Sequence, residues 1–375
     1  MIYLDHNATT PLRASARAAM LATLSDGVGN PSSAHAAGRA ARSALERARR
    51  SLAEALGVAP AAVCFTSGAT EANNLAVLGA LPEAVGRHVV ATPIEHASVL
   101  GPLRELERRG AAVTWLPVDG TGRVAVADVV AALVAGDGVG HRRVGERRSR
   151  HGAAHRRDRG RVPGAGVPLH VDAAQAVGRI AVDLAAVDLC TSPRTSSVGR
   201  SGSAPSSCGA AWGCSRSPGA AGRSAACAPA PENVAAAVGF AAAVAEAVPG
   251  AGIAALRDRL WDALAALGDV GRYGAPDGLA NTLTVGFRGL TGEAVVAALD
   301  LEGVAVSVGS ACAAGAGEPS HVLRAIGCDE QAARAGVRFS LGEATTAADI
   351  EVAAVAVRRV VARMRGVDAR LAVAG

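Results

Sequence analysis

The sequence predicts an α/β protein, with a doubly wound, mostly parallel sheet in a large domain and a smaller α+β domain at the C-terminal end. Short apolar segments alternate with helical periodicities across the first 135 residues, which is typical of a parallel sheet covered by helices. Half of the 375 residues are hydrophobic, enough for more than one core. We expect the large domain to span 15–250 and the small domain to join 1–14 with 251–375.

Strands and helices alternate in the first part of the chain. Apolar residues at helical spacing lead to Gly57, a residue that favours helix C-termini. The expected strands here are 63–65, 88–92 and 112–116, and the expected helices are 41–56 and 99–106.

The pattern returns with a strand at 167–172, and alanine-rich helices begin at Glu232. The C-terminal part then alternates again, which predicts the smaller α+β domain. Its expected strands are 282–287, 304–307 and 336–340, and its expected helices are 293–301 and 347–364.

Two stretches, 136–162 and 192–230, break this rhythm. The first has almost no aliphatic residues, and the second is a run of small and polar residues without periodicity. Each falls where a doubly wound fold should have a strand and its crossover. We therefore expect both stretches to be disordered or poorly packed, and the sheet of the large domain to lose two strands.

Charge and cysteine content limit the function classes. The net charge of +5 comes from arginines crowded between 142 and 161, so it does not indicate an anionic partner for the whole protein. The seven cysteines are widely spaced without a C-x-x-C pair, which favours a reducing compartment and no metal site. No signal-peptide pattern or membrane-spanning apolar run is evident. We expect a cytoplasmic protein.

Two segments are candidates for binding an anionic ring cofactor. Ser67–Asn74 follows a strand and opens a helix, so Ala69 and Thr70 lie where backbone N–H groups and the helix dipole attract phosphate. Asp172 ends an apolar strand, where its carboxylate could pair with a pyridinium nitrogen while Gln175 donates to a ring oxygen. The alternatives are an ordinary Ser/Thr-capped helix start and an Asp that caps the next helix.

His96 and Cys312 are the candidate catalytic residues. His96 follows a strand, where its ring could stack on a cofactor and transfer protons; a structural histidine is the alternative. Cys312 sits among small residues, and we expect a mobile, exposed loop on which a thiolate can reach a partner. An incidental surface cysteine is its alternative.

Arg338 and Asn30 are weaker candidates. Arg338, on a strand of the small domain, could clamp a substrate carboxylate with two N–H groups, although a lone arginine is also read as a surface charge. Asn30, in Gly-Asn-Pro-Ser, is a turn residue by default.

Taken together, these segments resemble the cysteine desulfurases, which are class-V aminotransferase enzymes of the pyridoxal-phosphate fold type I. The resemblance covers about 1–135, 166–191 and 231–365. The segments occur in the order typical of the family: Tyr3–Pro11, Gly29–Ser32, Ser67–Glu71, Glu95–His96, His170–Gln175, Gly309–Cys312 and Arg338–Ser340.

The resemblance implies a function and a role for each candidate. The enzymes move sulfur from L-cysteine to a cysteine persulfide, release alanine, and supply iron-sulfur clusters or tRNA thiolation through an acceptor protein. They work as homodimers with pyridoxal 5'-phosphate. By this likeness Ala69 and Thr70 hold the phosphate, Asp172 and Gln175 hold the ring, His96 stacks and transfers protons, Asn30 and Arg338 bind the cysteine carboxylate, and Cys312 becomes the persulfide.

One departure from the family is decisive for chemistry: the chain contains no lysine, because all 38 basic residues are arginine. The family expects Ser-x-His-Lys where this chain has Ser192–Thr195. Covalent attachment of the cofactor is therefore impossible here, since a guanidinium does not act as an amine nucleophile. We expect little or no turnover from the chain as it stands.

A frame-shifted translation of a GC-rich gene accounts for both aberrant stretches. Pro193–Ser197 written as CCG CGC ACA AGC TCG, read from the third base, gives Ala-His-Lys-Leu. A similar treatment of 146–159 restores an Asn-Asp-Glu-Val-Gly segment. Resequencing the gene across 135–232 tests this hypothesis.

Two other function classes stay open. The first is a non-catalytic scaffold or sulfur acceptor that keeps the fold and Cys312. The second is a nucleic-acid-binding arm at 141–161, which arginine runs would suit. That segment has no aromatic residues to stack on bases, so the first alternative is preferred.

Overall fold

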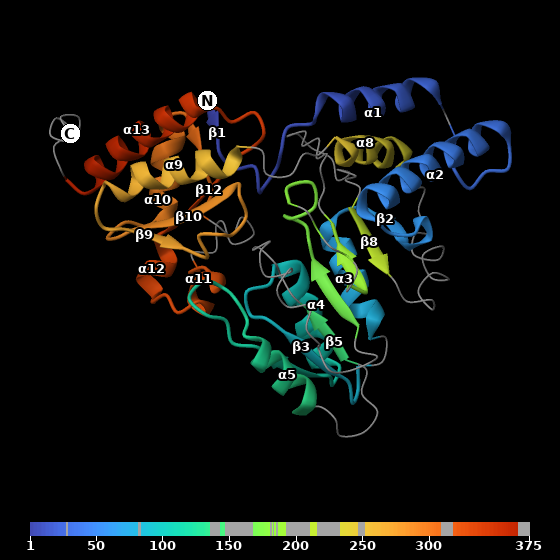
Figure 1. The fold of residues 1–375 in the computed structure, drawn as a ribbon, viewed down its shortest axis with the longest axis horizontal. Helices are drawn as coiled ribbons and strands as arrows, with labels where there is room; N and C mark the ends of the chain where they lie inside the picture. The colour runs from blue at the N-terminus through green and yellow to red at the C-terminus, as the bar shows by residue number, and fades with distance from the viewer. Residues whose placement is uncertain are drawn as a thin grey trace. The chain divides into compact units, whose positions relative to one another are not determined.

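A computed structural model describes residues 1–27, 29–81, 84–135, 143–146, 168–180, 182, 184, 187–192, 211–215, 233–246, 252–308 and 318–366. The chain divides into two compact units. The small unit contains Met1–Thr9, Pro117–Ala125 and Gly250–Gly375, and the large unit contains Thr10–Leu116 and Val126–Pro249 (Figure 1). The sequence did not predict that 117–125 groups with the small unit.

The described strands of the large unit form a seven-stranded sheet in the order β2-β8-β7-β6-β5-β3-β4. Neighbouring strands pair in parallel except for the two pairs that β8 makes. The predicted α/β class with a mostly parallel sheet is confirmed. The strands are β2 (Val63–Thr66), β3 (His88–Ala91), β4 (Ala112–Trp115), β5 (Arg143–Glu146), β6 (Leu169–Asp172), β7 (Leu189–Thr191) and β8 (Ala211–Ser215).

The expectation that both aberrant stretches lack strands is wrong. β5 lies within 136–162 and pairs with β3 on one side and β6 on the other. β8 lies within 192–230 and joins β2 to β7. The physical reason is that ladder hydrogen bonds come from the main chain, so a strand can form without an apolar pattern where an empty slot would leave both neighbours unpaired.

Helices of the large unit pack on this sheet through two hydrophobic clusters. One cluster joins α2 and α8 to β2, β6 and β7, and includes Leu45, Leu52, Val171 and Phe240. The other joins α3 and α4 to β3. α8 also packs against α1 (Figure 1). The helices are α1 (Ala14–Asp26), α2 (Ala36–Leu56), the short 3₁₀ helix η1 (Pro60–Ala62), α3 (Ala69–Ala80), α4 (Ala97–Arg108), α5 (Val126–Ala135) and α8 (Val234–Ala245).

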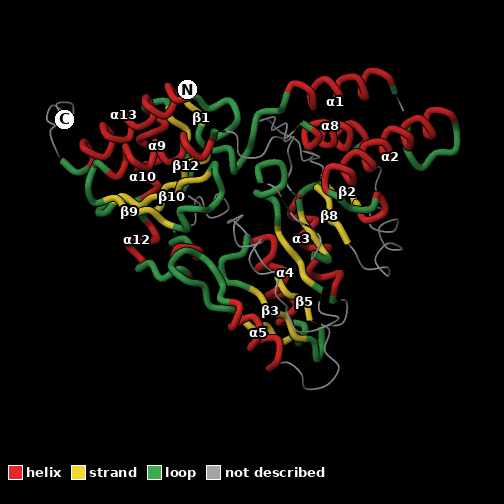
Figure 2. Tube along the Cα trace, viewed as in Figure 1, coloured by secondary structure: helices red, strands yellow, loops and turns green. Residues whose placement is uncertain are grey.

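The small unit combines a three-stranded antiparallel sheet, ordered β12-β10-β9, with a parallel pair of β1 and β11. Figure 2 shows its helices in red beside these strands. β10 and α13 have the bounds that the sequence predicts. The elements are β1 (Ile2–Tyr3), α9 (Ile253–Ala265), β9 (Val270–Tyr273), β10 (Thr282–Phe287), α10 (Gly292–Leu301), β11 (Val304–Ala305), α11 (His321–Ala325), α12 (Glu330–Arg334), β12 (Gly336–Ser340) and α13 (Ala347–Met364).

Its core is apolar and continuous from sheet to helices. Leu260, Phe287, Phe339 and Val357 are fully buried in one cluster. The expected strand 304–307 is shorter than predicted, because only its first two residues pair with β1, while Ser307 makes an isolated bridge to Arg338. In the part of the chain that the structure describes, no helix has the length and apolar character needed to cross a bilayer.

A reciprocal pair of hydrogen bonds begins α13. Thr346 Oγ1 accepts from the backbone N–H of Asp349 at 3.1 Å, and Asp349 Oδ2 accepts from the backbone N–H of Thr346 at 2.8 Å and from its hydroxyl at 2.7 Å. These donors, the backbone N–H first, lower the pKa of the Asp349 carboxyl from 3.8. The pair is a capping box, which satisfies two N–H groups that a helix start leaves unpaired.

We predict that Thr346→Ala lowers the free energy of unfolding by about 1 kcal/mol at pH 7. Because the pKa of Asp349 is depressed in the folded state, the contribution of its carboxylate is present above pH 3.8 and is lost as the pH falls through the lower folded value. Urea unfolding followed by circular dichroism should therefore show a smaller cost in acid. Asp349→Asn, which cannot titrate, is the control, and an equal cost of Thr346→Ala at pH 7 and pH 3 would contradict the prediction.

Candidate functional site

The start of α3 presents backbone N–H groups without a side-chain cap. Gly68 is the N-cap residue, and among the described residues this start has no side-chain cap hydrogen bond. The alternative of an ordinary Ser/Thr-capped start is therefore wrong. Ala69 is half-buried and Thr70 exposed, and both lie in the first turn, where unpaired N–H groups and the helix dipole suit a phosphate.

Asp172 lies at the carboxyl end of β6 with only 5% of its surface exposed. Its Oδ1 accepts from the backbone N–H of Ala174 at 2.9 Å, and its Oδ2 accepts from Asn73 Nδ2 at 3.1 Å. These two donors are neutral, so they leave the carboxylate able to pair with a cation. A protonated ring nitrogen is such a cation.

His96 is the N-cap residue of α4 and is half-buried. Its Nδ1 accepts from the backbone N–H of Ser98 at 3.1 Å and lies 2.7 Å from Ser98 Oγ. A backbone N–H can only donate, so Nδ1 is an acceptor and a neutral ring carries its proton on Nε2. His96 thus has a structural task at the start of α4, and its chemical role stays a prediction.

Asn73 joins the two candidates. Its Nδ2 donates to Ser98 Oγ at 2.8 Å as well as to Asp172, and its side chain is fully buried. A series of hydrogen bonds therefore links α3, α4 and β6, and it runs from Asp172 through Asn73 and Ser98 to His96. We call these four residues the Asp172–His96 network.

The sequence reasoning missed Asn73 and Ser98. A signal was present for Asn73, since it lies four residues after Ala69 and so on the same face of the helix, among apolar residues that pack inward. Nothing local distinguished Ser98 from a helix-start serine, because its partner Asn73 is 25 residues away.

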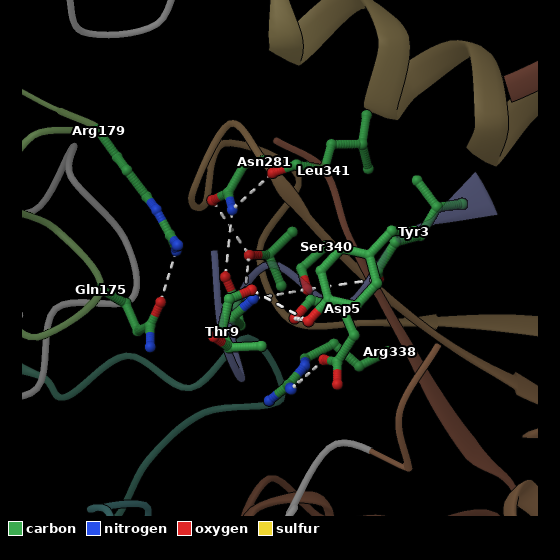
Figure 3. A network of polar contacts seen from close by, with 12 residues as sticks. Tyr3, Asp5, Thr9, Gln175, Arg179, Asn281, Arg338, Ser340 and Leu341 are labelled. Atoms are coloured by element: carbon green, nitrogen blue, oxygen red, sulfur yellow. Dashed lines mark hydrogen bonds and ion pairs between the residues drawn. The ribbon is translucent and has the colours of Figure 1, made fainter. Parts of the chain in front are cut away.

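Gln175 follows β6, and its side chain contacts Arg179. The Arg179 guanidinium donates to Gln175 Oε1, and Figure 3 shows the two side chains pointing toward each other. This bond fixes which end of the amide accepts. The opposite end is the NH2 group, which is the donor that a ring oxygen would require.

Asn30 is exposed and forms the turn that the sequence predicts. Its Oδ1 accepts from the backbone N–H of Ser32 at 2.9 Å, and its carbonyl accepts from the N–H of Ser33 at 2.9 Å. The first turns of α2 pack closely on this turn, because a Cβ at Gly38 would lie 2.4 Å from the carbonyl oxygen of Ser33 and 2.8 Å from that of Asn30. Backbone contact with α2 therefore sets the position of Asn30.

Arg338 lies in the small unit, and its interpretation as a surface charge is wrong. The side chain is buried, with 7% exposed, and its Nη2 pairs with Asp5 Oδ1 at 2.9 Å (Figure 3). Asp5 bridges to Ser340 on the neighbouring strand, which brings the carboxylate beside the guanidinium. Asp5 was missed as a site residue, and it orients the arginine that the sequence proposes as a carboxylate clamp.

The N-terminal segment that carries Asp5 is held by polar contacts within the small unit. Tyr3 donates to the carbonyl oxygens of Asp5 and Thr9, each at 3.1 Å. Burial, followed by the Asp5 charge, raises the pKa of the Tyr3 phenol, so it stays a donor. Asn281 Nδ2 donates to Asn7 Oδ1 at 3.1 Å and to the carbonyl of Leu341 at 3.3 Å (Figure 3).

Cys312 and the segment 193–195 lie outside the described residues. Within the described ranges, no group of three or more histidine, cysteine, aspartate or glutamate residues could hold a metal ion.

The residues of the candidate site fit part of the predicted cofactor. The uncapped start of α3 suits the phosphate, and Asp172, with two neutral donors, suits the ring nitrogen. The chain has no lysine, so covalent attachment does not fit. The site can hold pyridoxal phosphate only through reversible contacts.

Comparison with known proteins identifies the same family over most of the chain. The family model described as aminotransferase class-V matches residues 2–191 and 231–352. The chain is similar to an IscS-like cysteine desulfurase of Mycobacterium tuberculosis, with 38% identity over 411 residues that cover all of this chain and 99% of the relative.

Solved structures show the same fold. A NifS-like protein has a TM-score of 0.79 at 24% identity, covering 98% of this chain and all of the other. A structure of SspA in complex with cysteine has a TM-score of 0.73 at 25% identity, covering 91% of this chain and 99% of the other.

The contact between Gly38 and the Asn30 turn gives a test of the local packing. Gly38→Ala should lower the free energy of unfolding by about 1–3 kcal/mol, because the new Cβ meets backbone atoms that cannot move without displacing the turn. Gly79→Ala is the matched control, since that helical glycine has nothing within 4 Å and should gain about 0.5 kcal/mol. Urea unfolding measures both, and a Gly38→Ala protein as stable as the parent would show that the turn is loosely packed.

Proposed function

We propose that this chain, which belongs to the class-V aminotransferase family, is a cysteine desulfurase in architecture and descent. The observation that carries the proposal is the buried Asp172–His96 network beside the uncapped start of α3. The relative named an IscS-like cysteine desulfurase, which aligns along the whole chain, supports it. Pyridoxal phosphate is the cofactor that this family uses.

Four residues that the structure describes have a proposed role in binding the cofactor. Ala69 and Thr70 bind its phosphate at the positive end of α3. Asp172 pairs with the ring nitrogen, and His96 stacks on the ring and holds a proton on Nε2. When bound, pyridoxal phosphate supplies an electron-withdrawing ring that stabilises negative charge on a neighbouring carbon.

L-Cysteine is the proposed substrate, and the structure of SspA with cysteine supports that choice for a protein of the same fold. Arg338, oriented by Asp5, and Asn30 bind its carboxylate. With the family's lysine restored at residue 195, the Cys312 thiolate would attack the substrate sulfur, so an S–S bond would form while the C–S bond breaks. The electron pair of that bond would stay on the carbon skeleton, which would take up a proton and leave as alanine.

A sulfur-acceptor protein, a homodimeric state and a cytoplasmic location belong to the same proposal. The persulfide on Cys312 has to pass its sulfur to another thiol-bearing or cluster-assembling protein. The similarity to a protein named an IscS-like cysteine desulfurase supports a role in sulfur transfer, and we propose iron-sulfur clusters or tRNA thiolation as its destination.

We infer that the missing lysine results from a frame-shifted segment. The family match stops at residue 191 and resumes at 231, which supports the assignment of 192–230 as aberrant. A single reading frame through both stretches on resequencing would reject the inference. The absence of lysine favours one second function for the chain as it stands, a non-catalytic scaffold that keeps Cys312 as a sulfur acceptor.

We predict that borohydride will not fix pyridoxal phosphate to any interior residue of this chain. No side-chain amine exists, so only the N-terminal amine can react, and peptide mapping separates the two cases. The chain should release little or no alanine from L-cysteine. Cofactor found on an interior peptide would contradict the prediction.

The triple variant Pro193→Ala, Arg194→His and Thr195→Lys restores the family segment and should be labelled at residue 195. Thr195→Arg in the same background is the matched control, because it keeps the charge but supplies no amine nucleophile. A second protein, the frame-restored chain, has both aberrant stretches corrected. If borohydride fixes the cofactor to it but it releases no alanine from L-cysteine, the protein binds the cofactor and is not a cysteine desulfurase.

A further inference from the structure

We propose that Asn73 and Ser98 are positioning residues that hold His96 as a neutral imidazole with its proton on Nε2 and tie that ring to the Asp172 carboxylate. The importance of this arrangement for catalysis rests on the proposed function. The hydrogen-bond directions themselves do not, since they follow from which atoms can donate.

The first step concerns His96 Nδ1, which faces two donors. The Ser98 backbone N–H lies 3.1 Å from Nδ1 and can only donate. Ser98 Oγ lies 2.7 Å from the same nitrogen. With Nδ1 accepting, a neutral ring carries its hydrogen on Nε2.

The second step fixes the direction of the Ser98 hydroxyl. Asn73 Nδ2 donates to Ser98 Oγ at 2.8 Å, and a hydroxyl has a single hydrogen. That hydrogen therefore points to His96 Nδ1. Asn73 in this way makes Ser98 a donor toward His96.

The third step fixes the Asn73 amide itself. One hydrogen of its NH2 group goes to Ser98 and the other to Asp172 Oδ2 at 3.1 Å. A flipped amide would set Oδ1 against the carboxylate oxygen, two acceptors in contact. Asn73 Oδ1 is buried, and no hydrogen bond from the described residues reaches it, so a flipped NH2 group would find no acceptor at that position either.

The consequence is a restricted role for His96. Its Nδ1 lone pair is occupied by two donors, so the hydrogen of the neutral ring is on Nε2, where it can act only as a hydrogen-bond donor. Two ionisable residues are linked to His96: Asp172, reached through Ser98 and Asn73, and the sequence neighbour Glu95, whose carboxylate accepts from the Thr92 hydroxyl. A hydrogen on Nδ1 would require the backbone N–H of Ser98 to lose its acceptor and the Ser98 hydroxyl to reverse its direction.

His35 provides an internal control for the measurement. It is the N-cap residue of α2, and its Nδ1 accepts from the backbone N–H of Gly38 at 3.2 Å. This is the same kind of backbone contact as at His96, but the His35 ring is exposed and no hydroxyl group of the described residues contacts it. A difference between the two rings then reports the second donor.

The test is ¹⁵N NMR of the imidazole nitrogens in the full chain labelled at histidine, with no cofactor added. His96→Gln and His35→Gln assign the two rings among the nine histidines. We expect an Nε2–H tautomer at His96, with an Nδ1 resonance displaced from that of His35. Ser98→Ala should remove this displacement and lower the ratio of the Nε2–H to the Nδ1–H tautomer about 2- to 10-fold, the effect of one hydrogen bond. Ser98→Thr, which keeps the hydroxyl, should restore the parent signal.

Asn73→Ala should change the His96 signal in the same direction and leave His35 unchanged. Circular dichroism checks that this variant folds; if it does not, the Ser98→Ala and Ser98→Thr pair decides. A proton on Nδ1 of His96, or a spectrum that Ser98→Ala does not alter, would overturn the proposal. Because neither cofactor nor turnover is needed, such a result is distinct from a failure of the desulfurase assignment.

Discussion

The buried amide of Asn73 is the contact on which the arrangement of the candidate site depends. One nitrogen donates to Asp172 at the end of β6 and to Ser98 at the start of α4, so three elements of the large unit share a single group. Such a group is costly to bury unless it is paired, and its pairing is directional. Apolar packing of α3 and α4 on β3 brings these elements together, and the amide then fixes how their side chains face one another.

The position of Asp172 also depends on the backbone pairing of the sheet. β6, which carries Asp172, is flanked by β5 and β7, and β7 is joined to β2 through β8. β5 and β8 come from the two stretches whose sequences show no strand pattern. The position of the Asp172 carboxylate therefore depends on main-chain pairing by segments whose sequences show no strand pattern. The ladder permits this because every residue has a main-chain acceptor and every residue except proline has a main-chain donor.

The sequence was most informative where periodicity and local caps agree. β10 and α13 have the predicted bounds, and α13 begins with a capping box that is visible as Thr346 and Asp349. Local patterns could not predict β5 and β8, the burial of Arg338, or its pairing with Asp5, 333 residues away. The roles of Asn73 and Ser98 were missed for the same reason, since they arise from contacts between elements that are distant in the sequence.

The absence of lysine separates two properties that pyridoxal-phosphate sites usually combine. The groups that we propose to position the ring and phosphate lie on α3, α4 and β6, whereas covalent attachment requires a side-chain amine that no residue of this chain supplies. Arginine cannot replace it, because its guanidinium stays protonated. Without a covalent bond, occupancy is set by concentration relative to the dissociation constant, and the phosphate and ring contacts supply all of the binding free energy. A chain of this kind can keep the stereochemistry of a desulfurase site while losing the step that starts its reaction.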